Sequence, residues 1–412
     1  MFKPTRSLAL PEFIALVAVT TSIVALATDV VLPALRMIGQ DLEVSDPNDP
    51  QLVITTLFLG FSMGQLLAGP LSDSFGRKVV ICLGYAVFVI GCVLSVAADD
   101  LSMMLAGRIL QGFGAAGPRV VVMSLIRDLY EGRAMARIMS IVMSVFILVP
   151  AVAPALGQGI LFFADWQSIF LMMIAFSIVG AVWLAARQPE TLAHENRRVF
   201  SLRNVLEGYR EAAGNRVAMG YSVCAGLIFG AFMSYLSSAQ QVFQEVFDTG
   251  ELFPLYFGAA ALSIGAASVV NSMLVMRLGM RKLTQYGFAG VSGLSAIFLG
   301  FLLAVDPQPS ITLFMAWLLP TFFFIGLQFG NLNALAMQPL GHMAGLGAAL
   351  VGSVSTIMAV PLGWFIAGRF AGGLEPLVGG FCAMGLCALV VMAWTERMPP
   401  FNASSAETPG QP

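Results

Sequence analysis

Apolar stretches, each about as long as a bilayer is thick, follow one another along almost the whole chain. A membrane-spanning helix needs about 20 mostly apolar residues, and twelve segments meet this requirement. They are residues 13–35, 51–71, 79–98, 101–125, 136–160, 167–186, 217–239, 253–276, 284–304, 311–337, 345–369 and 376–394. Short polar turns separate most of them. The pattern predicts an all-α integral membrane protein with twelve transmembrane helices.

One connection is much longer than the others and divides the spans into two sets of six. It is polar and partly helical over residues 201–213. The expected domains are a six-helix bundle at 1–186, a linker at 187–216, a second six-helix bundle at 217–394 and a tail at 395–412. The two halves also echo each other, because Gly76-Arg77-Lys78 and Gly279-Met280-Arg281-Lys282 both lie between the second and third helix of a half. Such a repeat is common in secondary transporters.

The basic residues predict the orientation of the chain. The two termini, the linker and the loops on their side carry 17 Lys and Arg, whereas the opposite loops carry only Arg36 and Arg369. Cytoplasmic loops of membrane proteins are enriched in Lys and Arg. We therefore expect both termini in the cytoplasm and a location in the bacterial inner membrane.

Composition excludes several functions. Charged residues make up 11% of the chain and hydrophobic residues 58%, whereas soluble domains carry about 25% charged residues. A net charge of −2 offers no basic surface for nucleic acid. The five cysteines lie in apolar stretches without CxxC spacing, and only two histidines occur, so we expect no metal site and no catalytic cluster. The protein is not expected to be an enzyme.

Three charged residues lie well inside the predicted spans, away from their ends: Asp29, Arg108 and Arg119. Ionisable groups at membrane depth are costly and often functional. Asp29 and Arg108 have similar depths in the first and fourth spans, so they can pair directly or share a water-filled cavity. Asp29 is a candidate proton carrier, with Arg108 controlling it or contacting substrate; a structural role in helix packing is the alternative for both. Arg119 lies nearer the cytoplasm, where its side chain can extend to the interface.

Polar and aromatic side chains within the spans supply candidates for a substrate cavity. Amides in spans either join neighbouring helices or face the substrate, and aromatic side chains line apolar pockets. The candidates are Gln111, Phe229, Phe232, Gln328 and Asn331.

The loop after the second span carries a recognisable motif. The segment Gly69-Pro70-Leu71-Ser72-Asp73-Ser74-Phe75-Gly76-Arg77-Lys78 resembles the signature G-x-L-x-D-x-x-G-R-[KR] of the major facilitator superfamily. Gly69 and Gly76 allow tight turns and close helix approach. The resemblance implies a latch that closes the cytoplasmic side, in which Asp73, Arg77 and Lys78 act with Asp128 at the inner end of the fourth span.

Three further segments are similar to the Bcr/CflA branch of drug/proton antiporters within that superfamily. They are Thr28–Leu35 in the first span, Arg108–Ala116 followed by Arg127-Asp128 in the fourth, and Pro150–Gly157 in the fifth. In the fifth span, Pro150, Pro154 and Gly157 match the antiporter motif, and such prolines bend helices. Val31, Arg36 and Gln158 depart from the branch's pattern.

The resemblance implies an exporter of small amphipathic drugs or metabolites that exchanges them for protons. Its expected partners are a small-molecule substrate, protons and the lipid bilayer, it needs no cofactor beyond the proton gradient, and most relatives act as monomers. The alternatives are a proton-coupled or facilitative importer of a nutrient on the same fold, and a membrane receptor or scaffold that transports nothing.

Overall fold

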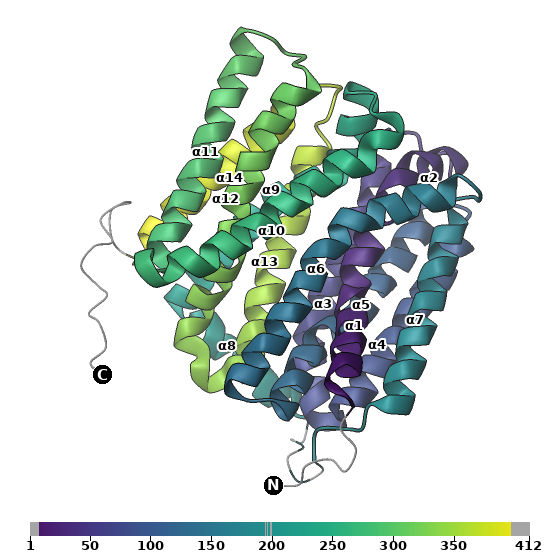
Figure 1. Cartoon of the computed structure of the whole chain (residues 1–412), viewed down its shortest axis with the longest axis vertical. Helices are drawn as coiled ribbons and strands as arrows, with labels where there is room; N and C mark the ends of the chain where they lie inside the picture. The colour runs from purple at the N-terminus through teal and green to yellow at the C-terminus, as the bar shows by residue number, and fades with distance from the viewer. Residues whose placement is uncertain (1–7, 194, 196, 198–199, 397–412) are drawn as a thin grey trace. The chain divides into compact units, whose positions relative to one another are not determined.

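The computed structural model describes residues 8–193, 195, 197 and 200–396 (Figure 1). Every long element in these residues is a helix, and they contain no strand. The predicted tail at 395–412 lies, from residue 397 onward, outside the described residues.

The described residues of the first half of the chain form six long helices and several short ones. The first predicted span is interrupted: α1 ends at Asp29, and a 3₁₀ turn that includes Pro33 leads into the short helix α2. The elements are α1 (Leu10–Asp29), η1 (Leu32–Ala34), α2 (Leu35–Asp41), η2 (Asp49–Gln51), α3 (Leu52–Phe75), α4 (Arg77–Val96), α5 (Leu101–Leu129), α6 (Gly132–Leu161) and α7 (Gln167–Arg187).

Among the described residues, the linker contains the helix α8, and six long helices follow it. A single π-helical turn, η4, extends the end of α9. The elements are α8 (Leu202–Gly214), α9 (Arg216–Gln241), η4 (Val242–Val246), η5 (Gly250–Leu252), α10 (Phe253–Leu278), α11 (Met280–Ala304), α12 (Ile311–Met337), η6 (Gln338–Met343), α13 (Ala344–Ala367) and α14 (Glu375–Glu396).

The membrane-spanning pattern is confirmed by these helices. Eleven helices among the described residues are long and apolar enough to cross a bilayer. The fifth predicted span corresponds to α6, whose most apolar stretch is the shorter Leu148–Leu161. Apart from the C-terminal part of the first span, predicted and observed ends agree to about one helical turn.

Two compact units can be distinguished by internal packing. Unit 1 comprises Met1–Glu207 and Leu236–Ala261, and unit 2 comprises Gly208–Tyr235 and Leu262–Pro412. In unit 1, α5 packs closely on α3 and α4, while α1 packs on α5 and α6. In unit 2, α11 packs on α12 and α14. The expected division into two six-helix bundles joined by a linker remains a proposal.

Glycine allows α3 and α5 to approach until their backbones touch. A Cβ at Gly112 of α5 would overlap the carbonyl oxygen of Leu57, and a Cβ at Gly60 of α3 would overlap the carbonyl oxygen of Ile109. Helices in membranes often associate through such small residues, because lipid gives them no hydrophobic driving force. This packing sets how close α3 lies to the charged side chain of Arg108 in α5.

Gly112→Ala should therefore destabilise the protein. The added methyl group meets a backbone carbonyl, which cannot move aside as a flexible side chain can, so we expect a loss of about 1–3 kcal/mol. The thermal unfolding midpoint in detergent should fall by several degrees. Gly159→Ala is the matched control, since nothing lies within 4 Å of the added carbon. Equal midpoints for the two variants would contradict this account.

Candidate functional site

Arg108 lies in the interior of unit 1 and is fully buried. Its Nε donates to the carbonyl of Val53 in α3 at 2.8 Å, and its Nη2 donates to the carbonyl of Ala27 in α1 at 2.8 Å. Its Nη1 donates to Oε1 of Gln111, one turn along α5, at 2.7 Å. The guanidinium carbon also lies 5.9 Å from the ring centroid of Phe170 in α7, within the range of a cation–π contact. One side chain thus joins α1, α3 and α5.

Gln111 continues this network into α4. Its Nε2 donates to Ser95 Oγ at 2.9 Å and to the Gly91 carbonyl at 3.2 Å. The side chain is fully buried, and its oxygen and nitrogen both have partners in the protein. These contacts favour a role in joining helices over contact with substrate.

Asp29 is the last residue of α1 and is 3% exposed. It forms no ion pair with Arg108, because the guanidinium binds the Ala27 carbonyl two residues earlier. The last four carbonyls of a helix lack partners within it, and Arg108 supplies one of them with a donor. Asp29 and Arg108 therefore meet the same end of α1, Asp29 as its last residue and Arg108 of α5 through its bond to Ala27, without forming an ion pair.

The fifth-span motif lies beside this helix end. Pro150, Pro154 and Gly157 are all within α6. A Cβ at Gly157 would overlap the carbonyl oxygen of Val30, the residue after Asp29. The motif glycine therefore permits α6 to pass against the point where α1 ends.

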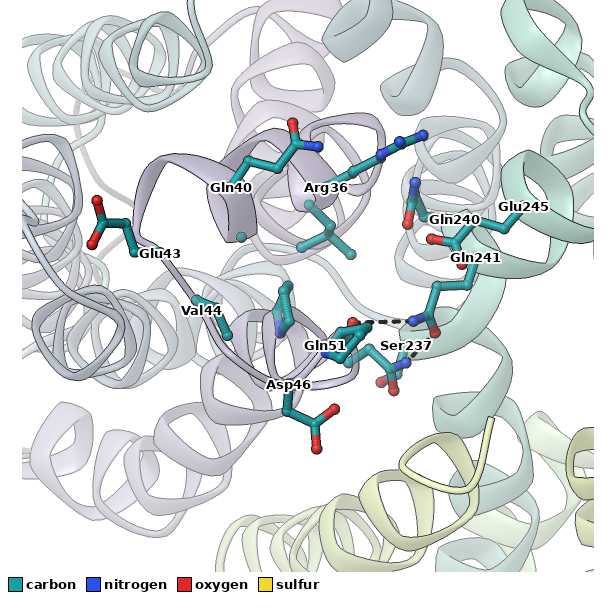
Figure 2. Close-up of a pocket in the computed structure, with 14 residues that line it drawn as sticks. Arg36, Gln40, Glu43, Val44, Asp46, Gln51, Ser237, Gln240, Gln241 and Glu245 are labelled. Carbon is teal, nitrogen blue, oxygen red and sulfur yellow. Dashed lines mark hydrogen bonds between the residues drawn. The ribbon is translucent and has the colours of Figure 1, made fainter. Parts of the chain in front are cut away.

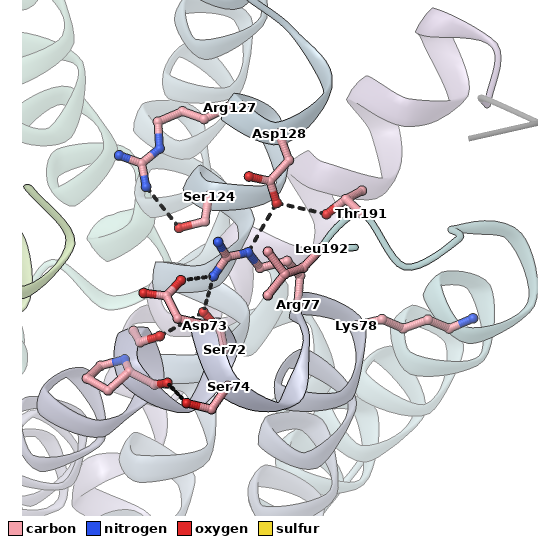
Figure 3. A network of polar contacts seen from close by, with 12 residues as sticks. Ser72, Asp73, Ser74, Arg77, Lys78, Ser124, Arg127, Asp128, Thr191 and Leu192 are labelled. Atoms are coloured by element: carbon pink, nitrogen blue, oxygen red, sulfur yellow. Dashed lines mark hydrogen bonds and ion pairs between the residues drawn. The ribbon is translucent and has the colours of Figure 1, made fainter. Parts of the chain in front are cut away.

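Arg77, the first residue of α4, connects the ends of three helices (Figure 3). Its Nε donates to Asp128 Oδ2 near the end of α5 at 3.1 Å. Its Nη1 donates to Ser72 Oγ at 2.7 Å and to Asp73, both in α3. The Arg77 side chain is only 8% exposed. The contact between Arg77 and Asp128 that the motif implies is present.

Two other motif residues have different surroundings. Gly69, expected to allow a tight turn or a close helix approach, lies inside α3, because that helix continues to Phe75. Lys78 donates from Nζ to the carbonyl of Ala185 near the end of α7. Only Gly76 has the backbone of a turn, with φ of 106°.

Glu190, just after α7, caps the start of α4. Its Oε1 accepts the backbone N–H of Arg77 at 2.9 Å, and its Oε2 accepts that of Lys78 at 3.1 Å. A carboxylate here satisfies N–H groups without intrahelical partners and lies at the positive end of the helix dipole. A Cβ at Gly76 would overlap the Glu190 carboxylate, so glycine is required for this approach as well as for its positive φ.

The linker is attached to the same network at a second point. Thr191 donates from Oγ1 to Asp128 Oδ2 at 2.9 Å, the oxygen that also accepts Arg77 Nε (Figure 3). Sequence analysis missed Glu190 and Thr191. The sequence did place an acidic and a hydroxyl residue just after the sixth span. They follow that span on the same predicted side of the membrane as the loop with Arg77 and Lys78.

Unit 2 contains a second network at the repeated loop. Gly279 precedes α11 with φ of 77°, as Gly76 precedes α4. Arg281 Nε lies 3.4 Å from Oε1 of Glu396 at the end of α14, and that oxygen also accepts the hydroxyl of Tyr221 in α9. The echo in the sequence thus extends to backbone conformation and to an acid near the C-terminal end of the sixth long helix of each half, Glu190 just after α7 and Glu396 at the end of α14. Glu396 and Tyr221 were not among the predicted residues.

Aromatic side chains form a cluster between α9 and α12 in unit 2. Phe232 lies 6.0 Å from Phe329, 5.7 Å from Phe322 and 6.2 Å from Phe229, measured between ring centroids. Phe229 and Phe232 are half-buried, whereas Phe329 is exposed. The two predicted cavity residues of α9 therefore belong to one partly exposed aromatic surface.

The predicted cavity residues of α12 contact neighbouring helices. Gln328 is fully buried and packs against Gly287 of α11. Asn331 donates to Asn271 Oδ1 of α10 at 2.7 Å. The Asn331 contact favours the helix-joining interpretation. The Gln328 amide instead donates to the Phe324 carbonyl of its own helix at 3.1 Å, and its Oε1 has no hydrogen-bond partner among the described residues.

Removing the cap on α4 should loosen its first turn. Glu190→Ala leaves the N–H groups of Arg77 and Lys78 without their carboxylate, which costs about 1 kcal/mol. Hydrogen–deuterium exchange in a peptide covering residues 77–82 should become roughly fivefold faster. Glu195→Ala, an exposed acid in the same linker, should leave the exchange unchanged. Identical exchange in Glu190→Ala and the parent protein would refute the capping role.

Comparisons with known proteins agree with this fold. Residues 17–363 match the profile of the Major Facilitator Superfamily. The chain is 27% identical to the bicyclomycin resistance protein homolog of Haemophilus influenzae, over 92% of this chain and 94% of that protein. It is 27% identical to the multidrug resistance protein MdtL of Escherichia fergusonii, over 91% and 93% respectively.

A solved structure supports the fold alone. The human organic anion transporter MFSD10 (TETRAN) superposes with a TM-score of 0.62 at 14% identity, covering 94% of this chain and all of that one. With the family profile matching most of the sequence, the chain belongs to the Major Facilitator Superfamily and is a multi-pass membrane transporter, not an enzyme.

Proposed function

We propose that this transporter exports small amphipathic drugs or metabolites in exchange for protons. The relatives named for bicyclomycin resistance and multidrug resistance, at 27% identity, support drug export. The observation that carries proton exchange is Asp29, the only acid within the predicted spans. The substrate class and the coupling ion that we propose for the transporter are those of the Bcr/CflA branch, which the sequence motifs resemble.

Asp29 has the surroundings that a proton carrier requires. An exchanger needs a group whose proton affinity changes between its two access states. Asp29 is nearly buried, it ends a helix, and α6 passes directly beside the next residue. A small movement of α1 against α6 would therefore change its exposure to water. Arg108 holds that helix end through Ala27 while leaving the carboxylate without a salt bridge.

The network of Arg77, Asp73 and Asp128 is the proposed latch of the cytoplasmic side. Its arginine is nearly buried and bonds to both acids, so the ends of α3, α4 and α5 move as one body. We place this network and both termini in the cytoplasm of a bacterium, on the basis of the basic loops. Glu190 and Thr191 then make the start of the linker part of the same latch.

The aromatic surface of unit 2 suits the apolar part of an amphipathic compound. Phe229, Phe232 and Phe329 offer ring faces and edges at a partly exposed position, and such surfaces bind varied apolar groups. A substrate and protons are the partners we propose, and the proton gradient is the only energy source required.

Asp29→Asn should abolish efflux driven by a pH gradient. The amide keeps the size and hydrogen-bonding ability of the side chain but cannot take up and release a proton. In sealed inverted vesicles, the variant should not accumulate bicyclomycin on acidification of the lumen, while downhill exchange of the same compound persists. Asp99→Asn, an exposed acid in a loop, should accumulate it as the parent protein does.

Two outcomes would count against this function. Uphill accumulation by Asp29→Asn equal to that of the parent protein would remove Asp29 from coupling. Proton-driven movement of substrate in the opposite direction, out of inverted vesicles, would identify an importer on the same fold.

A further inference from the structure

The linker helix α8 exposes two leucines on one of its sides. Leu202 and Leu206 are 58% and 57% exposed, and residues four apart lie one above the other on a helix. Phe200, which comes just before the helix, is exposed as well. A single exposed leucine needs no explanation, whereas adjacent ones form an apolar surface that favours an apolar partner. Leu202 and Leu206 are called the apolar stripe below.

A different face of α8 packs on α13. Ala212 is fully buried, and a Cβ at Gly208 would lie 2.7 Å from Cδ1 of Leu346. Each residue turns a helix by about 100°, so Gly208 and Ala212 point about 100–140° away from the centre of the apolar stripe. The contact with α13 therefore leaves the stripe uncovered.

The charged side chains of α8 follow a fixed order around the helix. Arg203 and Arg210 point about 60–80° from the centre of the apolar stripe, and Glu207 and Glu211 point about 120–160° from it. All four are exposed. Arg203 donates to Glu207 at 2.8 Å, but the two side chains are 87% and 63% exposed, and such exposed pairs contribute little. Basic groups therefore border the stripe and acidic groups lie beyond them, as in helices that lie on anionic membranes.

Neighbouring residues place α8 at the level of a membrane surface. Only Asn215 separates α8 from the spanning helix α9, and Leu346, which meets Gly208, is in the first turn of the spanning helix α13. Trp394, near the end of α14, is 61% exposed, and the guanidinium carbon of Arg216 at the start of α9 lies 4.5 Å from its ring centroid. Tryptophan is enriched at membrane–water interfaces. The apolar stripe therefore lies near the boundary of headgroups and acyl chains.

The other end of α9 reaches the opposite membrane surface (Figure 2). There Gln241 donates to the Pro47 carbonyl and to Asn48 Oδ1, both at 3.1 Å, beside a cavity of about 260 Å³. Because α9 with η4 is long enough to cross a bilayer, α8 and this cavity belong to opposite surfaces. The surface of α8 is the one predicted to carry 17 of the 21 Lys and Arg, so its charge complements anionic headgroups.

We propose that α8 is a lipid-binding helix that lies in the membrane surface on the side of the basic loops. Leu202 and Leu206 insert among the acyl chains, and Arg203 and Arg210 bind the phosphates of anionic lipids, which a guanidinium recognises with paired hydrogen bonds. This surface is separate from Asp29 and Arg108. The test below measures no transport, so the proposal fails or holds independently of the proposed function.

The test is hydrogen–deuterium exchange of the full-length protein in nanodiscs that each hold one copy. One set of discs contains phosphatidylglycerol, which is anionic, and the other contains phosphatidylcholine with the same acyl chains. A peptide covering residues 203–212 should exchange at least about fivefold more slowly in phosphatidylglycerol, because a helix bound at both arginines opens less often. High salt should reduce this difference. Equal exchange in the two lipids would overturn the proposal.

Variants locate the lipid effect. Leu206→Gln and Arg210→Gln each keep a good helix former and should lower the difference between the lipids to about twofold or less. Arg277→Gln is the matched control, because it removes an exposed positive charge at the end of α10, outside α8. Asn204→Gln changes the side of α8 opposite the stripe. Both controls should keep the full difference. A difference that survives in Leu206→Gln and Arg210→Gln would place the lipid elsewhere and overturn the proposal.

A second copy of this chain is the competing occupant of the apolar stripe. Discs with one copy contain no such partner, so slow exchange of α8 that depends on phosphatidylglycerol supports the lipid. Exchange in detergent that slows as the protein concentration rises, together with equal exchange in the two lipids, would identify a contact between copies and overturn the proposal.

Discussion

A buried guanidinium is the constraint on which the arrangement of unit 1 depends. Lipid and apolar side chains offer nothing to the N–H groups of Arg108, and an unpaired charge at this depth is costly. The side chain is therefore bonded to carbonyls of Ala27 and Val53 and to Gln111. These bonds require α1 and α3 to lie close to α5, and glycines such as Gly112 make that distance possible. Asp29 owes its position to the same arrangement, since its helix end is held two residues away.

At the helix ends, in contrast to Arg108, arginine side chains are paired with acidic side chains. Arg77 in unit 1 and Arg281 in unit 2 each follow a glycine with positive φ, and each bonds to an acid from another helix end. Within unit 1, Glu190 adds a cap for α4, so the start of the linker is bonded to the loop that carries the family motif. The recurrence of this design in both halves fits a repeated six-helix unit.

The spans were predictable from sequence because length and apolarity alone determine whether a helix can cross a bilayer. The interruption of the first span after Asp29 was not predicted, although Pro33 was visible, because a proline can kink a helix as well as end it. The contact of Arg77 with Asp128 could be anticipated from the motif. The contact of Glu190 with the start of α4 could not be anticipated, because the position of a loop residue in space does not follow from its spacing along the sequence.

The pairing of charges within the membrane was the least predictable feature. Equal depth allowed Asp29 and Arg108 to meet, but depth does not say which face of a helix each occupies. Backbone carbonyls, which every residue carries, also accept hydrogen bonds from a guanidinium, so a carboxylate is not its only available partner. Gln111 illustrates the same limit, because an amide in a span can face substrate or a neighbouring helix, and here its bonds go to α4.

We infer that Arg108 acts through directed hydrogen bonds to α1 and α3 and not through charge alone. Arg108→Lys tests it, because lysine keeps the charge but lacks the planar fork that reaches three acceptors. Its pH-driven transport in sealed vesicles and its thermal midpoint are measured beside those of the parent protein. We predict a lower midpoint and transport reduced by about tenfold or more, as for a lost charged hydrogen bond. Transport and stability equal to those of the parent protein would show that charge is sufficient and would contradict the account.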